Sequence, residues 1–425
     1  MKISDIVYKT PSEVAKMPRF DLVSPPEKQK GILTLVAWML SLPDVLRYGA
    51  KITKKDIKGL KPPYIVLANH NCFFDFKMAT KAIFPHKANY IVAVDGFINR
   101  ENIMRKVGCF GKRKFIQDIA MFKQVKHSLF VNKTVLMIYP EARYSITGTN
   151  SVIPDSLAKM IKKLGVPVVS LISHGHHLIQ PVWNLTNKRK IKTTADMTKI
   201  LTPEDCANLS VETIDKIIND SFYYDDYKWQ FDHKVEIKEK NRAEGIHKIL
   251  YKCPSCHSET GMTSLDHKII CTSCGKTYEM DTLGRLKAEK GETEFTHIPD
   301  WYEWERTEVR KELEAGTYHF EHEVEIESLP NSTGFYRFGT GKLIHNMQGF
   351  LVSGQWGEEK FLLKKSPLEN FATHIEFDYF GKGNAIDLSM TNDSFYMFSK
   401  SKDYLVVKVH FAVEELYKIN SLAKK

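Results

Sequence analysis

The sequence has little that would carry it into or across a membrane. Its longest nearly uncharged run, Gly31–Pro43, falls short of the roughly 20 apolar residues that a membrane-spanning helix needs. The N-terminus, Met1–Asp5, carries recurring charges with no apolar core behind it, which is unlike a secretory leader. The seven cysteines form no disulfide-like framework, and their odd number predicts a reducing, cytoplasmic compartment.

The chain also lacks long internal repeats, low-complexity segments and an excess of acidic residues. Lysine and arginine number 61 against 51 aspartates and glutamates. The net charge of +10 favours an anionic partner, which could be nucleic acid, an acidic membrane surface or a phosphorylated substrate. The composition, 43% hydrophobic and 26% charged, is that of a globular protein, and 425 residues predict two or three domains.

The run Gly31–Pro43 has two interpretations. Lys28 and Lys30 precede it and Trp38 lies within it, a pattern typical of a shallow apolar helix in a membrane interface. The alternative is an ordinary helix packed under the first domain. Both interpretations remain open at this point.

A histidine and an aspartate follow the first apolar run. This run, Tyr64–Ala68, ends at Asn69-His70, and Asp75 follows five residues later, before an expected helix over 76–83. Ligands of open α/β sheets bind beyond the carboxyl ends of the strands. His70 therefore stands where a general base would be placed, with Asp75 able to orient its ring. Such a pair also occurs by chance, so it needs support from the rest of the chain.

From residue 64 to about 190, short apolar runs alternate with amphipathic segments. The expected helices include 115–131 and 151–164, and the expected strands are 64–68, 90–94, 134–139 and 166–172. This alternation predicts an α/β fold with a mostly parallel sheet flanked by helices. Residues 191 to about 250 are polar, and we expect helices there, one of them capped by Thr202.

Four cysteines form two C-x-x-C pairs separated by fourteen residues: Cys253, Cys256, Cys271 and Cys274. Two such pairs around a short hairpin predict a zinc ribbon, because four thiolates suit a closed, structural zinc site. A redox pair or disulfides fit this spacing less well. Zinc ribbons are common in nucleic-acid machinery, but the neighbouring sequence has no stacked aromatics and no long basic stripe. A nucleic-acid partner is therefore disfavoured.

The last part of the sequence is rich in short strands. A helical linker, with a helix starting near Asp300, leads into a region where strand-like runs alternate with turn residues, and a helix at about 410–419 closes the chain. This pattern predicts a small antiparallel barrel or sandwich. The pleckstrin-homology fold is one analogy for it.

Three further stretches accompany the histidine and the aspartate. They are the glycine-containing basic segment Gly108–Lys114, the strand exit Tyr139–Ser145 and the Val-Pro strand 166–169. In this order, over about residues 60–190, the four blocks resemble the glycerolipid acyltransferase family, whose best-known members acylate lysophosphatidic acid. The third block departs from the family pattern, because Ala142 replaces a glycine and Arg143 stands one place early.

The resemblance implies acyl transfer from a thioester, acyl-CoA or acyl carrier protein, to the free hydroxyl of lysophosphatidic acid or a related lysophospholipid. His70 would be the general base and Asp75 would orient it. Arg143, with Lys112 and Arg113, would bind the acceptor phosphate, and Glu141 would hold Arg143 or the glycerol hydroxyls. The alternatives are a solvated basic loop for 112–114 and a surface turn for 141–143.

Two other groups have competing interpretations. Cys72 lies between the base and the carboxylate and could be a nucleophile, but the resemblance implies direct attack by the acceptor. His174, His176 and His177 could bind a metal. No carboxylate or cysteine stands beside them in the sequence, and strand alternation would point His176 and His177 to opposite sides. We expect a loop without metal there.

The resemblance implies an enzyme of phospholipid biosynthesis, and the net charge together with the run Gly31–Pro43 predicts that it is held peripherally on an anionic membrane. The expected division is a leader with the apolar helix (1–60), an acyltransferase domain (61–245), a zinc ribbon (246–290), a helical linker (291–316) and a β-rich domain with a C-terminal helix (317–425). The alternative is a catalytically inactive binding or scaffold protein on a degenerate acyltransferase fold, acting through the ribbon and the C-terminal domain. Ala142 and Arg143 favour that alternative, and the intact His70 and Asp75 oppose it.

Overall fold

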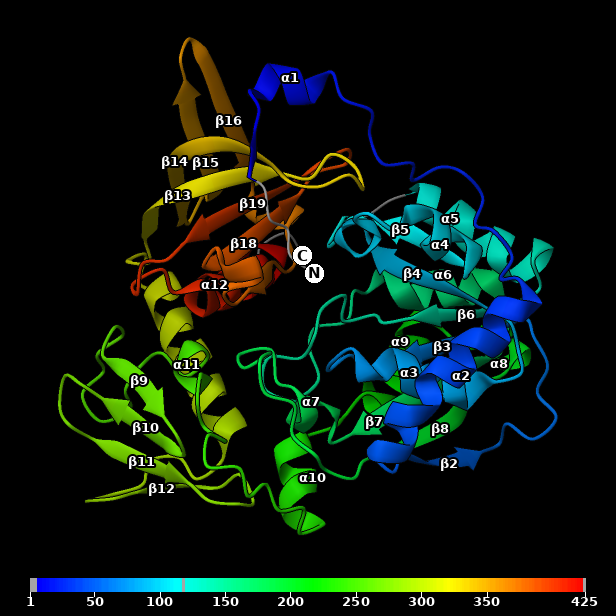
Figure 1. The fold of residues 1–425 in the computed structure, drawn as a ribbon, viewed down its shortest axis with the longest axis horizontal. Helices are drawn as coiled ribbons and strands as arrows, with labels where there is room; N and C mark the ends of the chain where they lie inside the picture. Colours follow the sequence, from blue (N-terminus) through cyan, green and yellow to red (C-terminus); the bar gives the residue numbers. More distant parts are fainter. Residues whose placement is uncertain (1–5, 117–118, 423–425) are drawn as a thin grey trace.

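The computed structural model describes residues 6–116 and 119–422. It contains an α/β unit, a small cysteine-bearing sheet and a larger antiparallel sheet (Figure 1). Residues 1–5, 117–118 and 423–425 lie outside this description. They include the start of the expected leader, two positions of the expected helix over 115–131 and the end of the expected β-rich domain. The expected domain boundaries stay predictions.

A seven-stranded sheet in the order β2-β8-β7-β3-β6-β4-β5 forms the α/β unit. Its strands are β2 (Lys51–Lys55), β3 (Tyr64–Ala68), β4 (Ala88–Ala93), β5 (Cys109–Lys112), β6 (Val135–Ile138), β7 (Val168–His174) and β8 (Thr194–Leu201). The central strand, β3, pairs in parallel with β7 and β6, whereas β8 runs antiparallel to β7. The prediction of an α/β fold with a parallel-containing sheet is confirmed.

Helices cover both faces of this sheet. Ile65 and Leu67 of β3 enter one apolar cluster with α6 and α9, and Val66 and Ala68 enter another with α3. Burial on both faces explains the continuous apolar run of β3. The helical segments of the unit are α2 (Gly31–Arg47), α3 (Phe74–Ile83), η1 (Val94–Phe97), α4 (Glu101–Lys106), α5 (Ile119–Lys126), η2 (His127–Val131), α6 (Ser156–Leu164), α7 (His176–Ile179), α8 (Pro203–Asn208), α9 (Val211–Ser221) and α10 (Asp226–Asp232).

Three strands of this sheet, β2, β5 and β8, are not predicted from the sequence. The expectation of helix throughout 191–250 is wrong for β8, which pairs with β7 on one side and with β2 on the other. Pairing with distant strands outweighs the polar local sequence there. The helix expected after Thr202 is present as α8, and the Thr202 hydroxyl accepts a hydrogen bond from the Asp205 backbone N–H.

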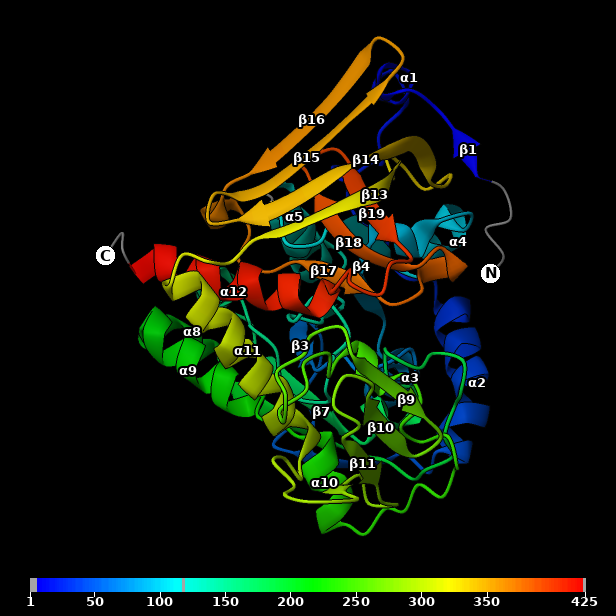
Figure 2. The same cartoon turned by 90° about the vertical axis from the view of Figure 1, so that its left-hand side faces the viewer.

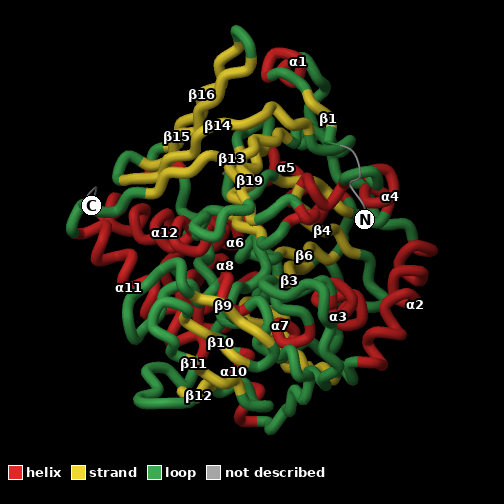
Figure 3. The backbone as a smooth tube through the Cα atoms, turned by 60° about the vertical axis from the view of Figure 1, so that its left-hand side comes forward, coloured by secondary structure: helices red, strands yellow, loops and turns green. Residues whose placement is uncertain are grey.

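Helix α2 turns its large aliphatic side chains outward. Its buried residues are Thr34, Ser41 and Val45, whereas its exposed ones include Ile32, Leu35, Met39, Leu40 and Leu46. The helix lies along the outer edge of the α/β unit (Figure 3). Across residues 6–116 and 119–422, no helix has the length and apolar character needed to cross a bilayer.

The cysteine-bearing sheet packs on a long helix. Its order is β12-β11-β10-β9, and its strands are β9 (Met262–Leu265), β10 (Lys268–Cys271), β11 (Thr277–Met280) and β12 (Leu286–Ala288), preceded by η3 (Ile246–Lys248). The helix is α11 (Ile298–Glu314). Its Trp301 ring lies 5.0 Å from the Tyr278 ring, and its indole N–H donates to the Lys252 carbonyl at 2.9 Å.

A separate antiparallel sheet forms the last unit, in the order β16-β15-β14-β13-β19-β18-β17, and β1 from the N-terminal segment pairs in parallel with β14. Helix α12 lies across α11 (Figure 2) and buries Ala412 and Leu416 of its apolar stripe. The prediction of a β-rich region is confirmed, and the pleckstrin-homology analogy stays a prediction. The elements are β1 (Val7–Tyr8), α1 (Pro11–Ala15), β13 (Phe320–Ser328), β14 (Tyr336–Asn346), β15 (Gly349–Trp356), β16 (Glu359–Lys365), η4 (Pro367–Glu369), β17 (His374–Glu376), η5 (Tyr379–Gly381), β18 (Asn384–Ser389), β19 (Ser394–Ser399) and α12 (Val406–Leu422).

Candidate active site

His70 and Asp75 meet at the carboxyl end of the central strand. β3 ends at Ala68, and the Asn69 side chain fixes the exit by exchanging two hydrogen bonds with the Ser173 backbone at the end of β7, at 2.9 and 2.8 Å. α3 begins at Phe74, which places Asp75 in its first turn. The His70 Nδ1 lies 3.0 Å from the Asp75 Oδ2. The structure thus brings together the two residues that the sequence paired.

The His70 ring packs against two tyrosines, one stacked on it and one tilted. Its centroid lies 4.2 Å from that of Tyr139, in a stacked arrangement, and 4.4 Å from that of Tyr144. The backbone N–H of Ser145 donates to the His70 carbonyl at 2.7 Å. The side chain of His70 remains 23% exposed, and within the described parts of the chain its Nε2 has no hydrogen-bond partner. This nitrogen is therefore available to a bound molecule.

Asp75 is a buried carboxylate with several donors. Its Oδ2 accepts from His70 and from the backbone N–H groups of Asn71 and Cys72, and its Oδ1 lies 2.6 Å from the Nδ1 of His176. Burial on its own would raise the pKa of Asp75, but the hydrogen bonds from His176 and His70 outweigh burial and hold the pKa well below its usual range. Asp75 is therefore an anion that fixes the His70 ring with its proton on Nδ1.

The Cys72 thiol is unsuited to nucleophilic attack. It is buried, and burial reinforced by the charge of Asp75 raises its pKa well above the ordinary value. A thiolate is the reactive form of cysteine, and this site disfavours it. The geometry thus favours His70 as a base over Cys72 as a nucleophile.

Glu141 lies inside the protein next to this pair. It is 1% exposed, its Oε1 accepts from the Ser151 backbone N–H at 3.0 Å, and the Tyr224 hydroxyl lies 3.4 Å from its Oε2. Burial raises the pKa of Glu141 to about 7, against the Ser151 hydrogen bond and the charge of Arg143. These two contacts hold the loop after β6 in place.

Arg143 points to the C-terminal helix. It is 6% exposed, and its Nη2 donates to the Glu414 Oε1 at 2.6 Å, while its Nη1 donates to the Thr373 carbonyl at 3.3 Å. Together with Arg306 and Lys418 it lines a polar cavity of about 380 Å³, whose lining does not include His70. Acceptor binding by Arg143, as predicted, would compete with Glu414.

All four hydrogen bonds of the Arg113 guanidinium go to residues of the β-rich unit. Its guanidinium is buried and donates to the carbonyls of Leu329, Pro330 and Asn392 and to the Ser394 hydroxyl, at 2.9 to 3.0 Å. Lys112 is half-buried at the end of β5, with its Nζ 3.1 Å from the Met121 Sδ. The alternative of a solvated basic loop does not describe Arg113, whose bonds hold two units of the protein together.

The sequence did not predict that Tyr139 and Tyr144 pack against His70 or that His176 pairs with Asp75. The histidines after β7 are conspicuous in the sequence, but their partner Asp75 lies 101 residues away from His176. Strand alternation does not apply to His176 and His177, because both belong to α7. No metal-binding group involving them is present in the part of the chain that the structure describes.

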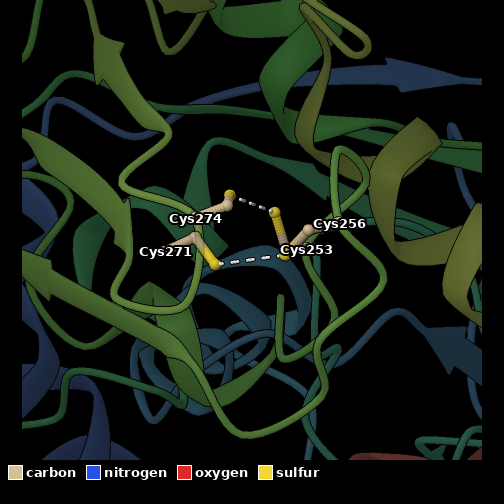
Figure 4. Close-up of side chains that lie close together, drawn as sticks. All are labelled: Cys253, Cys256, Cys271 and Cys274. Atoms are coloured by element: carbon tan, nitrogen blue, oxygen red, sulfur yellow. Dashed lines mark hydrogen bonds between the residues drawn. The ribbon is translucent and has the colours of Figure 1, made fainter.

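The four predicted zinc ligands converge (Figure 4). The Sγ atoms of Cys253, Cys256, Cys271 and Cys274 all lie within 4.8 Å of one another, with 3.8 Å between Cys253 and Cys274 and 3.7 Å between Cys256 and Cys271. Four sulfurs at ~2.3 Å from a tetrahedral zinc would be about 3.8 Å apart. The donor set and its spacing therefore fit one zinc ion, which would hold the two turns of the ribbon together.

No protein-family model and no curated protein matches the chain. Among solved structures, it is similar to the crystal structure of the 1-acyl-sn-glycerophosphate (LPA) acyltransferase PlsC from Thermotoga maritima. The two share 15% sequence identity with a TM-score of 0.36, over 45% of this chain and 78% of that one.

Proposed function

We propose that the protein is an acyltransferase that moves a fatty acyl group from a thioester to the free hydroxyl of lysophosphatidic acid or a related lysophospholipid. The observation that carries the proposal is the His70–Asp75 pair, with Nδ1 at 3.0 Å from the carboxylate and an open Nε2. The resemblance of the sequence blocks supplies the choice of reaction.

In this mechanism Asp75 keeps the His70 proton on Nδ1, so that Nε2 carries the lone pair. Nε2 takes the proton of the acceptor hydroxyl as its oxygen attacks the thioester carbonyl. When the carbon–sulfur bond breaks, the imidazolium returns the proton to the departing thiolate. An ester and a free thiol result, and no acyl-enzyme is formed, which agrees with the buried Cys72 thiol.

We also propose that α2 rests on an anionic membrane surface in a reducing compartment. Its outward aliphatic side chains have exposed cations at both ends, Lys28 and Lys30 before the helix and Arg47 in its last turn. A helix with an outward apolar face and flanking cations is typical of binding in the membrane interface. This arrangement would bring the enzyme to acceptors that reside in the membrane.

The decisive experiment measures acyl transfer by the purified protein. Acyl-CoA or acyl carrier protein thioester is supplied with lysophosphatidic acid, and the ester product is identified by mass spectrometry. We expect His70→Ala to lower the rate by about 10²- to 10⁴-fold, the usual contribution of a general base. His319→Ala, an exposed histidine of the β-rich unit, is the matched control. Transfer that persists in His70→Ala would overturn the mechanism.

A second candidate function is a catalytically inactive binding or scaffold protein. The observation that favours it is the engagement of Arg143 and Arg113 in contacts with the C-terminal unit. The acyl-transfer assay distinguishes the acyltransferase function from the scaffold function. If neither thioester supports transfer to any lysophospholipid or polyol acceptor, the scaffold function is the one that remains.

A further inference from the structure

Asp75 lies between two imidazole rings. On one side its Oδ2 lies 3.0 Å from the Nδ1 of His70, and on the other its Oδ1 lies 2.6 Å from the Nδ1 of His176. His70 is partly exposed, whereas His176 is fully buried and packs with its ring centroid 4.7 Å from that of Phe74. One carboxylate therefore serves a ring that can meet a substrate and a ring that cannot.

The protonation of His176 follows from its surroundings. Its Nε2 is buried, and among residues 6–116 and 119–422 it has no hydrogen-bond partner. A second proton there would create a buried charged N–H without an acceptor, which is strongly unfavourable. The ring that fits this site is the neutral tautomer, which has its proton on Nδ1 and donates it to Asp75.

Hydrogen bonds to the Asp226 carboxyl hold the backbone around His176 in place. Both oxygens of the buried Asp226 carboxyl accept backbone N–H groups at the start of α7, from Gly175 at 2.8 Å and from His177 at 2.9 Å. Gly175 has a φ of +81°, and a Cβ at this position would lie 2.6 Å from the Trp229 ring. A glycine is therefore needed at the turn that presents His176 to Asp75.

We propose that His176 is a positioning residue that acts on His70 through Asp75. The hydrogen bond from His176 fixes one oxygen of the Asp75 carboxylate and partly offsets its negative charge. The charge of Asp75 therefore acts less strongly on His70. The inference rests on the proposed function only where it concerns catalysis, because the coupling between the two rings is a property of the folded protein.

Other titratable groups also lie in the field of Asp75, and the test has to allow for them. They are Cys72, Tyr139, Tyr144, Glu141, Tyr224 and Asp226. The thiol and the phenols are buried, and burial raises their pKa values, which keeps them neutral near pH 7. Burial raises the pKa of Glu141 to about 7 and that of Asp226 to about 8, so these two carboxyls titrate in the same range as a histidine.

The test follows the His70 ring by NMR in protein labelled at the histidine side chains, between pH 5 and 9. In His176→Phe, which keeps a ring but lacks the donor, we expect the midpoint of the His70 titration to rise by about 0.5 to 1 pH unit. In His176→Asn, whose amide can donate from nearly the same place, we expect the midpoint to stay near that of the wild type. His174→Asn, which removes a partly exposed pairing with Asp196 at the end of β7, two residues before His176, is the matched control.

A double-mutant cycle shows whether the effect passes through Asp75. In an Asp75→Asn background, His176→Phe should no longer move the midpoint of the His70 titration. Repeating the His176 variants in a Glu141→Gln background removes the titration of Glu141, which overlaps with that of a histidine. In the transfer assay, His176→Phe should lower kcat/KM at pH 6 about three- to ten-fold more than at pH 8, because a larger fraction of His70 is protonated at the lower pH. His176→Asn should follow the wild type.

The outcomes separate the inference from the proposed function. An unchanged His70 midpoint in folded His176→Phe would overturn the inference, whatever the activity. An equal shift in His176→Phe and His176→Asn would also overturn it, because the hydrogen-bond donor that the asparagine retains would then make no difference. A shifted midpoint in a protein that transfers no acyl group would support the coupling and count against the acyltransferase function.

Discussion

Arg143 and Glu414 form a buried ion pair that joins the loop beside His70 to the last helix of the chain. The Nη2 and Oε1 atoms lie 2.6 Å apart, and the two residues are 6% and 1% exposed. Arg306 of α11 donates to the other oxygen of Glu414, also at 2.6 Å. One carboxylate thus connects the loop after β6 with α11 and α12.

Loss of the Glu414 charge should loosen this connection. Glu414→Gln removes the ion-pair partner of the buried Arg143, whereas Arg306 keeps its pairs with Glu303 and Glu415. Breaking a buried pair such as Arg143–Glu414 typically costs about 3–5 kcal/mol. We expect a lower thermal midpoint and faster proteolysis of α12. Glu314→Gln, at an exposed pair with Arg310 on α11, should change stability by about 0.5 kcal/mol or less. Equal effects of the two variants would show that the buried pair contributes nothing specific.

The same variant tests acceptor binding by Arg143. If Arg143 binds the acceptor phosphate, Glu414 competes with it, and Glu414→Gln should lower the KM for lysophosphatidic acid. The KM for an uncharged acceptor such as a monoacylglycerol should not fall, because it offers no phosphate. Steady-state kinetics with both acceptors measure the difference. A parallel change for the two acceptors would argue against a phosphate site at Arg143.

Glu141 should make stability depend on pH. Its pKa is raised from 4.5 to about 7 in the folded protein, so between these values the folded state keeps a proton that the unfolded state has lost. Stability therefore falls as pH rises through this window, by at most about 3 kcal/mol. Glu141→Gln has no proton to lose and should not show this fall in stability. The difference in unfolding free energy, variant minus wild type, should therefore increase between pH 5 and pH 8. Urea denaturation at several pH values measures it, and a pH-independent difference would contradict the assignment.

The cysteine cluster should hold about one zinc per chain. Elemental analysis of protein from metal-replete cells tests the stoichiometry, and a chelator should alter the fluorescence of Trp301, which packs on the ribbon. Cys271→Ser should lose the metal. Cys206→Ser changes another buried cysteine outside the cluster and should keep it. Well under one zinc per wild-type chain would count against the site.

Helix α2 should bind anionic vesicles through its outward side chains. Replacing Ile32 and Leu40, which are 66% and 71% exposed, with glutamate should reduce flotation with phosphatidylserine vesicles by about ten-fold or more. Tyr223→Glu with Leu265→Glu places the same charges at other exposed apolar positions. Trp38 is a poorer target, because its ring stacks on Phe84 at 4.7 Å. Equal flotation of both double variants and the wild type would exclude α2 as the anchor.

Much of the central sheet could be predicted because its strands are buried on both faces. The run from Tyr64 to Ala68 is apolar throughout, and few other structures explain such a run between turn residues. β8 could not be predicted in this way. It buries only Ala195, Met197 and Leu201 within a polar region, and it is a strand because β2 and β7 lie on either side of it.

The candidate site also has a part that local sequence predicts and a part that depends on distant contacts. The amino-acid sequence was enough to predict the His70–Asp75 pair and the two cysteine pairs, because five residues across a strand exit and a C-x-x-C turn bring side chains together locally. The other contacts of the site depend on the packing of distant segments. His176 meets Asp75 across 101 residues and Arg143 meets Glu414 across 271, and such contacts depend on how whole units pack. Local spacing can position a base and its carboxylate, but the other charges around them come from distant segments.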